Sequence, residues 1–272
     1  MNDPTALDFT PGLLNTLEND VMQADATGMI DDGAKDWFIL VTDYAFGHAM
    51  QADLTTTIEQ KGAKVVGAVR APLGTPDFAS FLLQAQTSKA DVIALANAGT
   101  DMTNAIKQAG EFGIMTSGQK LAALAMVISD VHALGLQTAQ GLVAATAYYW
   151  DRDDASREFA QRFNERTGRM PGMIQAGTYS AVLHYLRAVA AAGTVDADAV
   201  AEKMRELPVD DFFAHDGVVR KDGRMEHDMY LVEVKKPDES TQPWDYFKVL
   251  ATLPADLVTR PLSESDCPLV KD

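Results

Sequence analysis

Polar and aromatic side chains follow two apolar runs, at the places where α/β proteins hold ligands. Asp43, Tyr44 and Phe46 come directly after the run 37–42, which has the length of a buried strand and is rich in aromatic and β-branched residues. The carboxyl ends of parallel strands form the edge at which open sheets bind ligands. Tyr44 and Phe46 could line a crevice there or pack into the core, and we expect Asp43 to cap the following helix.

A second group of candidate residues lies at the carboxyl end of another predicted strand. The run 91–96 is followed by Asn97, Ala98, Gly99 and Thr100. Gly99 would let a ligand approach the backbone, and Thr100 could cap a helix whose first N–H groups face an anionic ligand. An ordinary tight turn explains the same residues. Together the two groups predict a binding crevice and no obvious reaction.

Motifs for catalysis and cofactor binding are absent from the sequence. No G-x-G-x-x-G, G-x-x-x-x-G-K-[ST] or G-x-S-x-G string occurs, which removes the best sequence support for dinucleotide, nucleotide and hydrolase chemistry. Asp43 follows a strand, as the phosphorylated Asp of a receiver domain does, but the acidic pair and the lysine that receivers need are not recognisable. The sequence therefore predicts a protein that is not an enzyme and holds no cofactor.

Metal-binding patterns are weak as well. The five histidines show no H-x-x-x-H or H-E-x-x-H spacing. His215-Asp216 and His227-Asp228 could converge on a metal, but solvated polar residues at strand ends explain them more simply. Cys267 is the only cysteine, which excludes an intrachain disulfide, a cysteine zinc site and a Cys-X-X-Cys redox pair. The sequence predicts no metal site.

Composition limits the classes of partner. The chain has 272 residues, a formal net charge of -16 and a pI near 4.6, which argues against nucleic acid and anionic membrane surfaces as partners. No apolar run reaches the ~18 residues that a membrane span needs. The first residues, Met1-Asn2-Asp3-Pro4-Thr5, lack the basic start and apolar core of a secretory signal. Either the protein stays inside the cell or the front of a longer precursor is absent here.

Apolar periodicity alternates between strand and helix over residues 36–146. Runs of strand length alternate with amphipathic segments of helix length, and Gly62 and Gly113 end two of these helices. Such alternation predicts right-handed βαβ units and a parallel, doubly wound sheet. The expected strands are 37–42, 64–69, 91–96, 120–126 and 141–146, and the expected helices are 46–61, 78–90, 101–112 and 130–136.

The alternation stops after the aromatic cluster Tyr148-Tyr149-Trp150, which could stack on a ligand or fill the core. Residues 155–208 are mainly helical and come without strands of their own to cover, so their apolar faces must be buried elsewhere. Asp-Gly turn chemistry predicts a hairpin between 218–224 and 229–234, and 244–249 adds an edge strand. The expected parts are 1–35 (lead-in helix and crossover), 36–147 (α/β lobe), 148–211 (helices) and 212–272 (hairpin and tail).

Several motifs in a fixed order resemble the type I periplasmic solute-binding proteins of ABC importers. The similarity is to the branched-chain amino acid binding branch, and most closely to its members that take aromatic carboxylates. It runs from about residue 15 to the end of the chain. The motifs are Asp43-Tyr44-Ala45-Phe46-Gly47, Asp77-Phe78 with Leu82-Leu83-Gln84-Ala85-Gln86, Ala96-Asn97-Ala98-Gly99, and Gln175-Ala176-Gly177-Thr178-Tyr179-Ser180-Ala181-Val182.

This resemblance implies a two-lobed fold that closes on a small ligand. It also implies a periplasmic protein that delivers the ligand to a membrane permease, with ABC permease and ATPase subunits as partners. Residues 36–146 match the second lobe, residues 155–208 match later helices of the first lobe, and the terminal hairpin returns to the second. The family's opening segment has no counterpart here, so we expect an incomplete first lobe. Exposed apolar faces on such a lobe could drive self-association.

The resemblance also implies roles for single residues. Phe46 falls where branched-chain amino acid binders present an aromatic ring, with Tyr44 beside it, and Ala98 or Gly99 falls where they place a second tyrosine. Met126 lies near the position of an acidic residue that receives the ligand ammonium, which favours a carboxylate without an amino group. We expect ligand contacts from these residues: Asp43, Tyr44, Phe46, Asn97, Ala98, Gly99, Thr100, Met126, Tyr149, Gln175 and Tyr179.

Three functions thus remain open from the sequence. The first is uptake of an aromatic or branched aliphatic carboxylate by an ABC transporter, with branched-chain amino acids as the closest alternative ligands. The second is a cytoplasmic ligand-sensing regulatory domain of the same fold, which the lack of a signal sequence favours slightly. The third is an enzyme on a doubly wound fold, for which no nucleophile, base or cofactor loop is present.

Overall fold

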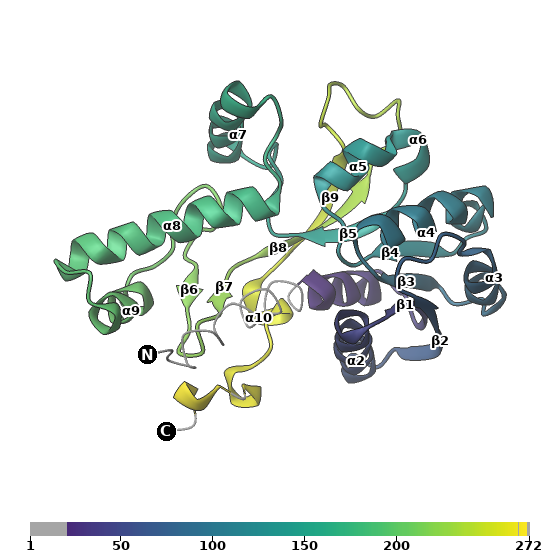
Figure 1. Cartoon of the computed structure of the whole chain (residues 1–272), viewed down its shortest axis with the longest axis horizontal. Helices are drawn as coiled ribbons and strands as arrows, with labels where there is room; N and C mark the ends of the chain where they lie inside the picture. The colour runs from purple at the N-terminus through teal and green to yellow at the C-terminus, as the bar shows by residue number, and fades with distance from the viewer. Residues whose placement is uncertain (1–20, 266, 271–272) are drawn as a thin grey trace. The chain divides into compact units, whose positions relative to one another are not determined.

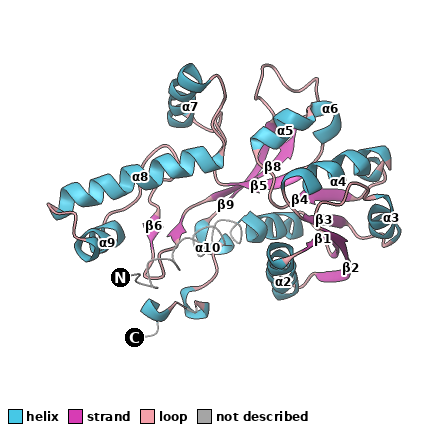
Figure 2. Cartoon of the chain, in the orientation of Figure 1, coloured by secondary structure: helices cyan, strands magenta, loops and turns pink. Residues whose placement is uncertain are grey.

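The computed structural model describes residues 21–265 and 267–270. These residues divide into two compact units. The sheet unit comprises residues 21–146 and 230–253, and the helical unit comprises residues 147–229 and 254–270 without residue 266. Most of the strands, drawn in magenta in Figure 2, belong to the sheet unit.

The sheet unit is built on seven strands in the order β2-β1-β3-β4-β5-β8-β9. The first five run parallel, and β8 pairs antiparallel with β5. Every residue of β3 is buried, as expected for a central strand covered on both faces. The strands are β1 (Asp36–Asp43), β2 (Lys64–Pro72), β3 (Val92–Ala96), β4 (Lys120–Ala123), β5 (Val143–Thr146), β8 (Met229–Val234) and β9 (Phe247–Leu253).

Helices cover both faces of this sheet. The helical residues 21–31 and α2 lie on one face, and α3 to α6 lie on the other (Figure 1). Because α2 connects β1 to β2 while α3 returns past β1 to β3, the chain winds in both directions from β1. The helices are α2 (Ala45–Gln60), α3 (Ala79–Thr87), α4 (Gly99–Glu111), the 3-10 turn η2 (Ile114–Thr116), α5 (Ile128–Leu134) and α6 (Leu136–Ala139).

A buried glycine sets the close approach of α2 to the end of β1. A Cβ atom at Gly47 would lie 2.1 Å from the carbonyl oxygen of Thr42 and 3.2 Å from Val41 Cγ1. No side chain fits at that distance, so the turn from β1 to α2 requires glycine at this position. This packing fixes Tyr44 and Phe46 at the carboxyl end of β1.

The helical unit is organised along α8 (Met173–Ala192). One stripe of α8 is buried, formed by Met173, Ala176, Ser180, His184 and Ala188 at spacings of three and four residues. The opposite side of the helix carries exposed apolar side chains. The other elements are α7 (Asp154–Thr167), α9 (Ala197–Glu206), β6 (Val218–Val219), β7 (Met225–Glu226), α10 (Ala255–Val258) and the 3-10 turns η3 (Leu262–Glu264) and η4 (Pro268–Val270).

The predicted alternation of strands and helices over 36–146 is confirmed, and one prediction in the later chain is wrong. The hairpin closes between β6 and β7, not between 218–224 and 229–234. Arg220 N–H donates to Arg224 O at 2.8 Å and closes the turn between β6 and β7. Residues 229–234 instead join β5, because Met229, Leu231, Val232 and Val234 are buried in the main sheet. Within the expected lead-in segment 1–35, residues 21–31 are helical, and residues 1–20 lie outside the described residues.

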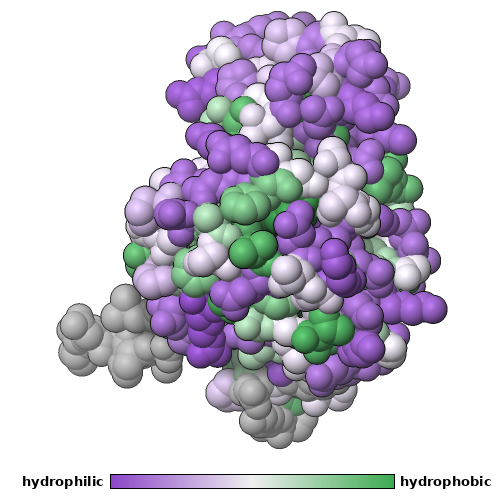
Figure 3. Space-filling view, turned by 90° about the vertical axis from the view of Figure 1, so that its right-hand side faces the viewer, coloured by the Kyte–Doolittle hydropathy of each residue, from purple (hydrophilic) through white to green (hydrophobic). Residues whose placement is uncertain are grey.

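One face of the molecule shows how hydrophilic and apolar residues are distributed. The face drawn in Figure 3 is largely hydrophilic, and its apolar residues form separate patches. Among the described residues, no helix is long and apolar enough to cross a membrane.

Candidate ligand-binding site

The sheet unit has a topological switch point between β1 and β3. These strands are parallel neighbours, with Val41 paired to Ala96 near their carboxyl ends. The helix after β1 leaves on one face of the sheet and the helix after β3 leaves on the other (Figure 1). Open α/β sheets bind ligands in the crevice that such a divergence creates.

The residues after β1 lie on one side of this switch point. Tyr44 and Phe46 are half-buried and their ring centroids are 5.7 Å apart. The prediction that Asp43 caps the helix is wrong. Tyr44 is the N-cap residue, without a side-chain cap, and the Asp43 carboxylate lies 2.7 Å from His48 Nε2. The reason is that Tyr44 adopts extended backbone, φ -156°, so α2 begins one residue too late for Asp43.

The residues after β3 lie on the other side. Asn97 is fully buried, and neither its Oδ1 nor its Nδ2 atom has a hydrogen-bond partner among the described residues. Gly99, at φ +57°, and Thr100 are the exposed first two residues of α4. The predicted cap by Thr100 is wrong, because Ala98 is the N-cap residue and no side chain caps α4. The first N–H groups of α4 therefore lack a side-chain acceptor.

Met126 follows β4, the next strand of the sheet. It is 1% exposed, and its amide donates to Ala123 O at 3.1 Å. The turn continues into α5, where Asp130 Oδ2 accepts from the Val127 amide at 3.0 Å. Burial raises the pKa of Asp130, against the opposing effect of that hydrogen bond. Met126 is therefore a buried apolar residue of the turn after β4, and its ligand contact stays a prediction.

Three candidate residues lie in the helical unit instead. Tyr149 is 4% exposed and its ring centroid lies 5.8 Å from that of Trp150. Gln175 accepts a hydrogen bond from the Gly172 amide at 3.0 Å, which closes the first turn of α8. Tyr179 packs its ring 5.1 Å from Phe159 between centroids. Gln175 and Tyr179 therefore have structural roles within their own unit, and their ligand contacts stay a prediction.

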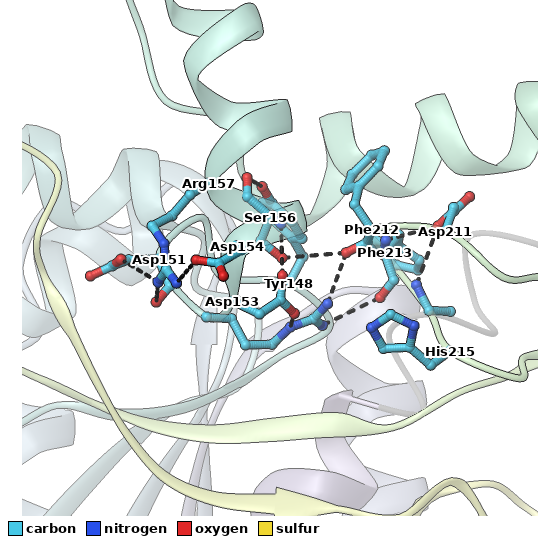
Figure 4. A network of polar contacts seen from close by, with 12 residues as sticks. Tyr148, Asp151, Asp153, Asp154, Ser156, Arg157, Asp211, Phe212, Phe213 and His215 are labelled. Atoms are coloured by element: carbon cyan, nitrogen blue, oxygen red, sulfur yellow. Dashed lines mark hydrogen bonds and ion pairs between the residues drawn. The ribbon is translucent and has the colours of Figure 1, made fainter.

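A polar network holds the start of the helical unit together (Figure 4). Arg152 donates to the Asp153 carboxylate at 2.8 Å and to Phe212 O at 2.8 Å. Tyr148 donates to Ser156 O at 3.0 Å, and burial raises the pKa of the Tyr148 phenol. This network anchors residues 148–156 to the segment around Phe212. Tyr148, from the expected aromatic cluster, fills the core of the unit.

The described residues contain no group of three His, Cys, Asp or Glu side chains that could hold a metal ion. His215 lies 3.4 Å from Asp210, and His227 Nδ1 lies 2.8 Å from the backbone oxygen of Asp228. Burial lowers the pKa of His227 and favours its neutral form. The two His-Asp pairs are thus explained by local contacts.

Sequence analysis missed one residue at the switch point. Asp101, in the first turn of α4, is 5% exposed. Its Oδ2 accepts from the Gly74 amide at 3.1 Å and lies 3.5 Å from the Thr42 hydroxyl. An acidic residue early in a helix is a common feature of exposed helices. Nothing in the pattern indicates that this one turns toward two other strand ends.

An open, mostly parallel α/β sheet with a topological switch point is typical of a class of ligand-binding proteins. The chain belongs to the periplasmic binding protein family, whose sequence model matches residues 3–240. Family membership confirms the predicted type I periplasmic-binding-protein fold. The family consists of binding proteins and not of enzymes, as the sequence indicated.

Known relatives support this assignment. A periplasmic binding protein from Burkholderia mallei is 50% identical, with a TM-score of 0.84 over 93% of this chain and 67% of its own. A branched chain amino acid ABC transporter periplasmic ligand-binding protein from Burkholderia xenovorans is 39% identical, with a TM-score of 0.89 over 93% and 68%. A "Leu/Ile/Val-binding protein homolog 6" from Brucella melitensis is 27% identical over 78% of this chain. The chain spans 56% of that relative's length.

Proposed function

We propose that this chain is the substrate-binding component of an ABC transporter and binds a small organic acid, with an aromatic or branched aliphatic body. The observation that carries this proposal is the pair of helix N-termini at the switch point. Neither α2 nor α4 has a side-chain cap, and they begin after neighbouring parallel strands. Two such N-termini offer N–H donors and positive dipole ends to one anionic group.

The apolar part of the ligand is inferred from the residues beside those N–H groups. The half-buried rings of Tyr44 and Phe46 would supply an aromatic wall, and Met126 is a buried apolar residue in the turn after β4. Small-ligand sites combine apolar walls with a few polar groups that fix orientation. A carboxylate with a ring or branched chain matches both parts of this description.

The test is thermal unfolding of the chain with benzoate, 4-methylpentanoate and leucine. A ligand at ~100 times its Kd stabilises the protein by about 2.7 kcal/mol. We expect a carboxylate to raise the melting temperature, the variant Phe46→Ala to lose the rise, and Phe112→Ala to keep it. Phe112 is the matched control, since it is 38% exposed at the far end of α4. A cooperative melt that no compound shifts would contradict the proposal.

Branched-chain amino acids are the closest rival ligands, because two of the relatives carry that specificity in their names. Leucine and 4-methylpentanoate share one aliphatic body and differ only in the ammonium group. Among the expected ligand residues, Asp43 alone carries a carboxylate that could receive it. A preference for leucine that Asp43→Asn abolishes would favour the amino acid, whereas equal or better binding of 4-methylpentanoate supports the proposed acid.

The proposal includes a periplasmic location for this chain. It would deliver its ligand there to the membrane permease of an ABC transporter, which works with ATPase subunits. A cytoplasmic ligand-sensing domain of the same fold is the second function. Fractionation of cells that express the native gene distinguishes them: recovery with the periplasmic fraction supports transport, and recovery with the cytoplasm supports sensing.

The proposal also assigns a role to each part of the chain. Residues 36–147 would act as the ligand-gripping lobe, with 148–211 as helices of the other lobe, 1–35 as the lead-in and 212–272 as the return and tail. The exposed apolar side of α8, which includes Ile174, Val182 and Leu186, would mediate self-association. Sedimentation velocity at several protein concentrations tests this part.

A further inference from the structure

The loop after β2 is attached to α4 at two points. At the first, the Gly74 amide donates to Asp101 Oδ2 at 3.1 Å. At the second, two turns along α4, Gln108 Oε1 accepts from the Phe78 amide at 2.7 Å and Gln108 Nε2 donates to Pro76 O at 3.0 Å. Residues 73–78 are thereby held against α4 on both sides of the bend.

The first attachment differs from the second because it includes β1. The carboxylate of Asp101 also lies 3.5 Å from the hydroxyl of Thr42, the residue before Asp43. Thr42 is 1% exposed and Asp101 is 5% exposed, so these contacts are shielded from water. One carboxylate therefore joins the end of β1, the loop after β2 and the first turn of α4.

The direction of the Asp101 side chain matters for the helix that carries it. An acidic residue in a first turn commonly accepts from the free N–H groups of its own helix. Asp101 instead accepts from Gly74 and Thr42, and α4 has no side-chain cap. The first N–H groups of α4 stay available to an incoming anion, while the nearby negative charge is bound by other donors.

We propose that Asp101 is a positioning residue for ligand binding, which fixes Tyr44, the loop 73–78 and the first turn of α4 as one rigid edge without touching the ligand. The expected effect of Asp101 on ligand affinity rests on the proposed function. Its expected effect on the rigidity of these three segments rests on the structure alone. Gly74 completes the contact, since its φ of +77° directs the amide in a conformation that other residues rarely adopt.

The experiment compares Asp101→Ala and Asp101→Asn with the unaltered chain by amide hydrogen exchange. Loss of the carboxylate should raise exchange in the first turn of α4, in 73–78 and in 42–46 together, by about ten- to hundredfold, as expected for one charge-assisted hydrogen bond. Asp101→Asn keeps one acceptor oxygen and should restore most of the protection. Faster exchange in α4 alone would overturn the inference, because a simple effect on the helix N-terminus explains it.

Titration with benzoate, 4-methylpentanoate and leucine gives the second readout. We expect Asp101→Ala to weaken the best of these probes by about tenfold or more, and Asp101→Asn to recover most of the affinity. Asp196→Ala is the matched control, since Asp196 accepts from the Ala199 amide at 3.1 Å and caps α9 in the helical unit. It should lower thermal stability while leaving the Kd of the probe unchanged.

The two readouts separate the inference from the function on which it rests. If no probe binds the unaltered chain, the proposed function fails for these ligands, and hydrogen exchange still decides whether Asp101 joins the three segments. If a probe binds and Asp101→Ala keeps the same Kd, the positioning role is wrong even though the protein is a carboxylate binder.

Discussion

Helices α4 and α8 both carry apolar residues, but α4 buries all of its own, whereas α8 buries one stripe and leaves several apolar side chains exposed. Met102, Ala105 and Ile106 of α4 are 0% exposed, because the parallel sheet lies beneath them. In α8, Val182 is 54% exposed and Leu186 is 55% exposed. The difference teaches that an apolar helix face finds its core only where a sheet supplies the second layer. Within the described residues, the sheet unit has that layer and the helical unit lacks it on one side of α8.

Truncation of one apolar residue in each helix should give the largest difference in the free energy of unfolding. Ile106→Ala removes a fully buried side chain and should lower the free energy of unfolding by about 2–5 kcal/mol. Leu186→Ala removes an exposed one and should cost less than about 0.5 kcal/mol. Urea denaturation followed by circular dichroism measures both. A large loss for Leu186→Ala would mean that this side of α8 is covered in solution.

The packing of α2 on β1 gives a second large effect. A methyl group at Gly47 would lie 2.1 Å from Thr42 O, so Gly47→Ala should cost about 1–3 kcal/mol through the shift that it forces. Gly110, in α4, is the matched control because a Cβ there has no neighbour within 4 Å. Gly110→Ala should raise stability by about 0.4–1 kcal/mol. Thermal melts of the two variants should therefore move in opposite directions.

Much of the sheet unit could be predicted from the sequence, because its signals are local. The apolar run 37–42 and the amphipathic pattern after Phe46 locate β1 and α2 to within a residue or two. The helix caps at Asp43 and Thr100 were wrong, since one residue of extended backbone decides which side chain reaches a free amide. Such a shift leaves no trace in apolar periodicity.

The contacts at the switch point depend on tertiary structure and could not be predicted in the same way. Asp101 meets Gly74 and Thr42 across 27 and 59 residues of sequence, and the sequence gives no sign of those partners. Nor does it indicate that Asn97 is fully buried without a hydrogen-bond partner among the described residues. The prediction of the hairpin was wrong for a related reason. The pattern of 229–234 predicts a strand, but the partner of that strand, β5, is selected by burial in the main sheet.

A buried carboxyl group in the sheet unit makes the stability of the protein depend on pH. Asp25 is fully buried in the helix 21–31, and burial raises its pKa well above 3.8. The folded state therefore keeps a proton that the unfolded state loses, so stability falls as pH rises from 3.8 through the folded pKa. Asp25→Asn removes this loss.

The stability gained by Asp25→Asn should be absent near pH 3.8 and grow with pH across that window, by on the order of 1 kcal/mol per pH unit. Urea midpoints measured from pH 4 to pH 8 give the difference. Asp238→Asn, at an exposed loop position of the same unit, should show no such growth. A gain that does not depend on pH would mean that the Asp25 carboxyl is not protonated by burial.

The smallest expected effect on stability, and the sharpest test of the comparison, comes from charges placed on the exposed side of α8. Val182→Lys with Leu186→Lys should change the free energy of unfolding by less than about 0.5 kcal/mol, because both positions face solvent. If that side of α8 mediates association, the same variant should sediment as a smaller species than the unaltered chain, since a lysine pair cannot enter an apolar interface without a large desolvation cost. The equivalent charges on α4, at Ile106, should instead unfold the sheet unit. Unchanged sedimentation of the α8 variant would mean that the exposed apolar residues of this helix do not mediate self-association. The two units would then differ in how fully they bury their apolar residues, and this difference would not affect the oligomeric state.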